Sequence, residues 1–287
     1  MATVYLARRG GTHVAVKELH RFLAEDPACH AHLADEARIL GAIRHPNVVA
    51  LLDVIAVGDG TSALVMEWVD GVSLVALLDA LAATGRRLPL DVVAALARDV
   101  LAGLEAAHEA RGVDGAPLGI VHRDVSPQNV LVGIDGRARL IDFGVARSSE
   151  RQQQTIEGAI KGKLRYLAPE QLDGHCDRTT DVFALGVVLW ELLTGQRLRT
   201  ASAIAPALVE IFCGVVVPPS THAREAAVLD EVVLRAVRRD PEDRFATEHE
   251  MATALSDAVP PATAARVAAV LRDVLDDVAA AARPQAA

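Results

Sequence analysis

The segment from Ile120 to Gly144 constrains this chain more than any other part of the sequence. It alternates apolar runs with polar loops, and it reads IVHRDVSPQNVLVGIDGRARLIDFG. We expect three strands in it, with a turn at Asp135-Gly136 between the second and the third. Because a hairpin holds its two arms side by side, Asn129 and Asp142 should lie together at one edge of a sheet.

Composition and charge exclude several classes of protein. The chain has 287 residues, and 51% of them are hydrophobic, which suits a globular protein of one large domain or two lobes. A net charge of −9 without a long basic run argues against nucleic-acid binding. The three cysteines are widely spaced, so we expect neither disulfides nor a zinc site, and a cytoplasmic location. We also expect no signal peptide and no membrane segment.

The pattern of apolar residues changes near Asp70-Gly71, which we interpret as a hinge. Before it, the sequence predicts strands over 3–7, 13–18, 48–57 and 62–69 and a helix over 27–43. After it, the sequence predicts helices over 72–83, 90–110, 181–193, 205–217, 229–238, 248–258 and 262–282. We therefore predict an α+β protein with a small β-rich lobe (1–69), a large α-helical lobe (70–258) and a C-terminal helical extension and tail (259–287).

The polar residues of the central segment carry a resemblance to a known family. His122-Arg123-Asp124 with Asn129, followed by Asp142-Phe143-Gly144, match the patterns H-R-D-x-x-x-x-N and D-F-G. The chain therefore resembles a bacterial eukaryotic-like (Hanks-type) serine/threonine protein kinase, over roughly residues 1 to 255. The resemblance implies the bilobal kinase fold and transfer of the γ-phosphoryl group of ATP to Ser or Thr hydroxyls of protein substrates in signal transduction.

The resemblance also implies roles for the matching residues. Asp124 would be the base that accepts the proton of the attacking hydroxyl, and Asn129 and Asp142 would hold Mg²⁺. Lys17, at the end of VAVK, would bind the ATP phosphates and pair with Glu36. Taken alone, Lys17 and Glu36 could equally be a surface strand residue and a solvated helix residue. Their order ahead of Asp124 favours the ion pair.

The family's adenine pocket corresponds to residues of the small lobe and one residue of the large lobe. Met66 in LVMEWV would be the gatekeeper, and the backbone at Glu67 and Val69 would face the adenine edge. The apolar residues on either side of the adenine would be Val4, Ala15 and Leu131. Periodicity does not distinguish these three from ordinary core residues.

Further matches imply structural roles. Leu40, Leu51, His122 and Phe143 would form the family's hydrophobic column, so His122 should be structural and not a general base. The APE motif, Ala168-Pro169-Glu170, closes the activation segment, and Arg244 would pair with Glu170. Asp181 would accept hydrogen bonds from the backbone of the catalytic loop.

The sequence departs from the family pattern at its start. Of the Gly-rich loop G-x-G-x-x-G-x-V only the end is present, with Ala2 at the third Gly and Val4 at the Val. We expect the first strand to be missing, a sheet edge at residues 3–7 to be unpaired, and ATP binding to be weak. A misassigned start codon at an internal Met would explain this departure, and an inactive truncated kinase is the alternative.

Two further departures involve Ser126 and Lys163. The catalytic-loop lysine of the family is Ser126 here, and the threonine of G-T-x-x-Y is Lys163. Lys163 could return to the reacting phosphoryl group the positive charge lost at Ser126, in a chain that otherwise favours Arg. Alternatively, Lys163 is a surface residue and Ser126 disables the site.

We expect regulation in the polar segment after Asp142. Thr155 is the candidate site of activating phosphorylation, and Arg123 would supply a cation to its phosphate. Ser148 and Ser149 are alternative sites, and an unmodified solvated loop is a further possibility.

Two other functions compete with the kinase hypothesis. One is a pseudokinase or scaffold with weak nucleotide binding, which the truncated Gly-rich loop favours and the complete set of motif residues opposes. The other is a small-molecule phosphotransferase of related fold, against which the APE motif and the long activation segment argue. The sequence identifies neither the protein substrate nor the oligomeric state.

Overall fold

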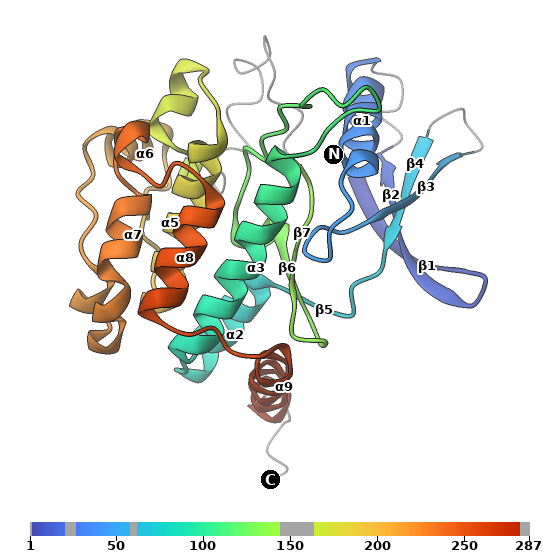
Figure 1. The fold of residues 1–287 in the computed structure, drawn as a ribbon. Coiled ribbons are helices and arrows are strands. Elements are labelled where there is room, and N and C mark those ends of the chain that lie inside the picture. The colour runs from blue at the N-terminus through green and yellow to red at the C-terminus, as the bar shows by residue number, and fades with distance from the viewer. Residues whose placement is uncertain (1, 21–26, 58–61, 144–163, 282–287) are drawn as a thin grey trace.

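The computed structural model describes residues 2–20, 27–57, 62–143 and 164–281. A small antiparallel sheet with one helix forms one end of the molecule, and a larger group of helices forms the other (Figure 1). This arrangement confirms the bilobal α+β fold that the sequence predicts. The segment after Glu67 runs from the small lobe into the large one.

The small sheet has its strands in the order β1-β2-β4-β3, all antiparallel. Its strands are β1 (Ala2–Arg9), β2 (Thr12–Leu19), β3 (Leu51–Ala56) and β4 (Ser62–Glu67). Gly10 and Gly11 form the predicted turn between β1 and β2, with φ angles of 55° and 87° that suit glycine. Helix α1 (Pro27–Ala42) packs on β3 and β4. β1 is an edge strand with an exposed apolar stretch, Val4, Tyr5 and Leu6.

A second sheet of three strands lies at the junction of the lobes. β5 (Gly71–Ser73) pairs with β6 (Val130–Gly133), which pairs with β7 (Ala138–Leu140) across the predicted turn at Asp135-Gly136. The prediction of a helix from Val72 was wrong at its start, because residues 71–73 form β5 and Ser73 caps α2 (Leu74–Thr84). Gly71 approaches β6 so closely that an added Cβ would lie 2.1 Å from the carbonyl oxygen of Val132.

The strand predicted at Ile120 is absent from the described residues. The backbone N–H groups of His122 and Arg123 donate to the carboxylate of Asp181, at 2.8 Å each, and not to a neighbouring strand. Arg123 has a φ of 64°, which is outside the strand region. The predicted strand over 48–57 is also shorter, because Val48 and Val49 associate with Leu140 of β7 and leave the small sheet to begin at Leu51.

The large lobe is built around one buried helix. Helix α5 (Arg178–Thr194) is buried from Thr180 to its end, and α3 (Leu90–His108), α7 (Asp230–Ala236) and α8 (Glu248–Ala258) pack against it. Helix α6 (Ile204–Cys213) is shorter than predicted because the chain is extended from Gly214 on. Helix α7 is also shorter than predicted, because residues 224–229 form a 3₁₀ helix before it and Val237 ends it as the C-cap.

The C-terminal helix α9 (Ala264–Ala281) packs on α2 and α3 of the large lobe, at the lower edge of Figure 1. Val267, Leu271 and Val274 bury its apolar face. Arg266 pairs with Asp91, and Arg86 pairs with Asp277, so ion pairs flank this apolar contact. Within the described ranges, no helix has the length and apolar character needed to cross a bilayer.

Candidate active site

Lys17 of β2 lies between two carboxylates. Its Nζ is 2.6 Å from Oε1 of Glu36 on α1 and 2.6 Å from Oδ1 of Asp142, which follows β7. The side chains of Lys17 and Glu36 are only 14% and 11% exposed. Burial acts to lower the pKa of Lys17, but Asp142 and then Glu36 outweigh it and the pKa is raised. Lys17 therefore stays charged at neutral pH and joins both lobes at one point.

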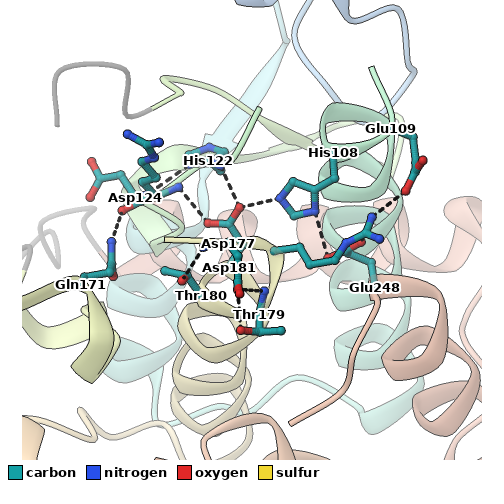
Figure 2. Close-up of polar contacts among 12 residues, drawn as sticks. His108, Glu109, His122, Asp124, Gln171, Asp177, Thr179, Thr180, Asp181 and Glu248 are labelled. Carbon is teal, nitrogen blue, oxygen red and sulfur yellow. Dashed lines mark hydrogen bonds and ion pairs between the residues drawn. The ribbon is translucent and has the colours of Figure 1, made fainter. Parts of the chain in front are cut away.

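The catalytic loop is held from below by Asp181 of α5 (Figure 2). Oδ2 of Asp181 accepts the backbone N–H of His122, and Oδ1 accepts that of Arg123, both at 2.8 Å. Asp181 is fully buried. Since a φ of 64° is uncommon for a residue other than glycine, these two hydrogen bonds hold a strained conformation at Arg123.

Asn129 fixes the backbone that carries Asp124. Its Nδ2 donates to the carbonyl oxygen of Asp124 at 2.8 Å and lies 3.2 Å from Oδ2 of the same residue. Its backbone N–H donates to Ser126, and its carbonyl accepts from Ile141. The nitrogen of the side-chain amide is thus directed toward Asp124, which leaves the amide oxygen for another partner.

Asp142 has a φ of 56°, a second strained position beside Asp124's loop. Its neighbour Phe143 is buried, with its ring 4.6 Å from the ring of His122. Nε2 of His122 is 3.1 Å from the carbonyl oxygen of Ile141, so this nitrogen must carry a proton and donate it. His122 is fully buried by these contacts, and Leu40 lies in the same core with Leu51 packed against it.

The residues expected around the adenine are partly brought together. The register pairs Val4 with Lys17 and Ala15 with Met66, so all four lie on one face of the small sheet. Val4 is 55% exposed, while Ala15, Met66 and Val69 are buried. The backbone N–H of Glu67 donates to Ala50 at 2.9 Å, so it is not available to a ligand. Leu131 is half-buried on β6, in the other sheet.

The end of the activation segment is anchored to the large lobe. Arg244 donates to both carboxylate oxygens of Glu170, at 2.6 and 2.8 Å, and its side chain is fully buried. Gln171 donates from Nε2 to the carbonyl oxygen of Arg123, at 3.1 Å. The segment after Tyr166 and the catalytic loop are therefore directly connected.

Several of the predicted site residues lie outside the part of the chain that the structure describes. Thr155 and Lys163 lie outside the described residues, as do the alternatives Ser148 and Ser149. Ser126 is described and is buried at the start of the short 3₁₀ helix 127–129. The predicted coupling between Ser126 and Lys163, and the phosphorylation of Thr155, stay predictions.

Sequence reasoning missed three polar residues that support the site. Gln171 follows the APE motif, and His108 and Glu248 form a buried cluster with Asp181. No spacing pattern connects these residues, because they come from different helices that lie far apart in the sequence. Of the three, only His108 has a local signal, as a polar residue at the end of a mostly apolar helix.

Comparison with known proteins agrees with this geometry. The model of the protein kinase domain family matches residues 1–253. The chain is 33% identical over 262 residues to the tyrosine-protein kinase MasK of Myxococcus xanthus and 34% identical over 267 residues to the serine/threonine-protein kinase PknB of Mycobacterium tuberculosis. In each case the alignment covers 89% of this chain and 40% of the relative.

A solved structure shows the same fold. The PknI kinase domain of Mycobacterium tuberculosis superposes with a TM-score of 0.65 and 27% sequence identity, covering 90% of this chain and 91% of that one. This chain belongs to the protein kinase domain family. It spans about two-fifths of the length of the curated relatives named above.

Proposed function

We propose that this chain is a serine/threonine protein kinase that transfers the γ-phosphoryl group of ATP to hydroxyls of protein substrates. The observation that carries the proposal is the position of Lys17 Nζ, 2.6 Å from both Glu36 and Asp142. This contact brings the small sheet, helix α1 and the DFG aspartate together, which kinases require for phosphoryl transfer. A pair of surface residues would not be buried to this extent.

The donor atoms of the site fit Mg²⁺. Asp142 supplies carboxylate oxygens on a side chain that is 45% exposed, and Asn129 supplies an amide oxygen whose nitrogen is already directed at Asp124. Hard oxygen ligands of this kind, few in number and completed by substrate phosphates, suit Mg²⁺. When bound, Mg²⁺ neutralises charge on the phosphates.

The remaining chemistry belongs to residues of the chain. Asp124, held by Asn129, orients the substrate hydroxyl and accepts its proton. Lys17 binds the α- and β-phosphates with its charged ammonium group, which Glu36 keeps in position. The strained backbone at Arg123 and Asp142 fixes the directions of the neighbouring side chains.

The choice of Ser/Thr hydroxyls over tyrosine rests on Pro127. This residue matches the Ser/Thr type of catalytic loop, and it begins the 3₁₀ helix that ends at Asn129. One relative bears the name of a tyrosine kinase and another that of a serine/threonine kinase, so the acceptor must be measured.

The test is a transfer assay with γ-labelled ATP, Mg²⁺ and a mixed protein substrate, followed by analysis of the labelled amino acids. We expect phosphoserine and phosphothreonine with the wild type, and a loss of about 10²- to 10⁴-fold in Asp124→Asn. Phosphotyrosine as the main product would overturn the acceptor class. ATP binding without transfer by the wild type would favour a scaffold instead.

A further inference from the structure

Three helix ends meet in a buried cluster beneath the catalytic loop. His108 is the last residue of α3, Asp181 lies in the first turn of α5, and Glu248 is the first residue of α8. Figure 2 shows the imidazole of His108 between the two carboxylates. The side chain of His108 is 4% exposed, and those of Asp181 and Glu248 are not exposed at all.

Both ring nitrogens of His108 face a carboxylate oxygen. Nε2 lies 2.8 Å from Oδ2 of Asp181, and Nδ1 lies 3.0 Å from Oε1 of Glu248, at ion-pair distance but without the alignment of a hydrogen bond. A neutral imidazole carries one N–H and would turn a lone pair toward one of the two carboxylates. The imidazolium ion carries two N–H groups and suits both.

The balance of charge leads to the same protonation state. Asp181 and Glu248 bring two negative charges, and Arg178 of α5 places its Nη2 3.2 Å from Oε2 of Glu248. Arg178 also pairs with the exposed Glu109, so it does not balance both buried carboxylates. With His108 protonated, its positive charge and that of Arg178 together match the two carboxylates, and an uncompensated buried charge is avoided.

Carboxylates on α5 and α8 favour the charged form of His108. Asp181 of α5 and Glu248 of α8 face its ring, and the exposed Glu109 also interacts with it electrostatically. Arg178 of α5 is a cation bound to Glu248 and Glu109, and it acts in the opposite direction. A cation at the C-terminus of α3 and an anion at the N-terminus of α8 both suit the helix dipoles. Burial opposes the charge, but Asp181 and Glu248 outweigh it and raise the pKa of His108 to about 9.

This cluster connects to the catalytic loop through a single carboxylate. The same Oδ2 of Asp181 that faces His108 also accepts the backbone N–H of His122, and Oδ1 accepts that of Arg123. The orientation of Asp181 therefore decides whether the strained backbone before Asp124 is held. In addition to these two backbone donors, the side chain of His108 contacts the Asp181 carboxylate and so helps to fix its orientation.

We propose that Glu248 and His108 are positioning residues for catalysis: the α8 carboxylate holds a charged His108 against Asp181, which in turn holds the catalytic loop. The role of the loop rests on the kinase function proposed above. If instead Glu248 only packs α8 against α3, the charge of His108 has no effect on turnover.

The test compares the pH dependence of kcat in the wild type, Glu248→Gln and the control Glu109→Gln. The control also removes a carboxylate from Arg178, but Glu109 is 60% exposed, and its carboxylate is not one of the two that lie against the ring nitrogens of His108. In Glu248→Gln we expect kcat to fall as pH rises above neutral, by roughly tenfold per unit beyond the new pKa of His108. The wild type and the control should stay flat to about pH 8, since His108 keeps its charge, and KM for ATP should change little in all three. Profiles of the same shape in all three proteins would overturn the proposal.

Two measurements stand apart from activity. An NMR titration of the His108 ring in the wild type should show the imidazolium ion at pH 7.5, whereas a ring that titrates near the ordinary value of about 6.5 would overturn the proposal. Hydrogen exchange of the His122 and Arg123 amides should be at least about tenfold faster in Glu248→Gln, an opening free-energy change of about 1.4 kcal/mol. Unchanged exchange would also overturn it. If the wild type transfers no phosphate, the kinase proposal fails. The NMR titration and the hydrogen exchange still decide whether Glu248 and His108 hold Asp181.

Discussion

Arg244 and Glu170 form a bidentate ion pair, although they are 74 positions apart in the sequence. Arg244 also donates to the carbonyl oxygens of Arg238, Arg239 and Thr179, so its guanidinium group is fully used. The pair attaches the APE segment to the loop before α8. Its guanidinium group also lies 4.7 Å from the ring centre of Phe183 on α5.

Removing one partner of this pair should destabilise the protein strongly. We expect Arg244→Ala to lower the free energy of unfolding by about 3–5 kcal/mol, because Glu170 and three carbonyl groups lose their donor inside the protein. Denaturant unfolding measures this. The control is Arg9→Ala, whose partner Asp53 is exposed, and which should cost about 0–1 kcal/mol. Equal losses in the two variants would contradict the argument.

Glu36→Gln should impair turnover without unfolding the small lobe. The neutral amide no longer fixes the Lys17 ammonium, so we expect kcat/KM for ATP to fall on the order of 10²-fold. The matched control is Glu18→Gln, because Glu18 follows Lys17 on the same strand and points to the opposite face of the sheet. A loss as large in Glu18→Gln, or none in Glu36→Gln, would show that the ion pair is not the cause.

Gly136 and Gly174 allow a test of the packing of α9. Both have positive φ, at 78° and 81°, but an added Cβ at Gly136 would lie 1.8 Å from the carbonyl oxygen of Ala264, whereas Gly174 has open space around it. Gly174→Ala should cost about 1–2 kcal/mol from its backbone conformation alone. Gly136→Ala should cost about 1–3 kcal/mol more. Hydrogen exchange along α9 should rise only in Gly136→Ala.

The stability contributed by His108 should depend on pH. Its pKa is raised from 6.5 to about 9 in the folded protein. The contribution is therefore complete below about pH 6.5 and is lost as pH rises through about 9. Its size is on the order of 3 kcal/mol, at about 1.4 kcal/mol per unit. The difference in unfolding free energy between the wild type and His108→Gln should shrink accordingly between pH 6 and pH 10, and a constant difference would contradict this prediction.

Elements with a clear periodicity of apolar residues, or with a short turn motif, were predicted from the sequence. The hairpin of β6 and β7 was predicted from apolar residues on both sides of Asp135-Gly136, and α8 was predicted with both of its ends correct. Strand β5 was missed because three residues are too few to show alternation. The strand predicted at Ile120 did not form because Asp181, far away in sequence, takes its backbone donors.

The same distinction applies to the site. Lys17, Asp124 and Asp142 were predicted from motifs of fixed spacing, and the structure places Lys17 against Asp142. His108 and Glu248 lie in no motif, and their contact depends on how α3, α5 and α8 pack. Such contacts depend on the whole lobe, so local sequence patterns do not predict them.

Among its contacts with the β6–β7 hairpin, the small lobe has two backbone attachments at separate places. One is the pairing of Gly71 with Gly133, and the other is the bridge between Val48 and Leu140 with the hydrogen bond from Val49. Rotation about a line through these two attachments leaves both intact, while sliding of one lobe across the other would break them. Opening of the small lobe while both attachments stay intact would have to break the ion pair between Lys17 and Asp142, which also joins the two lobes.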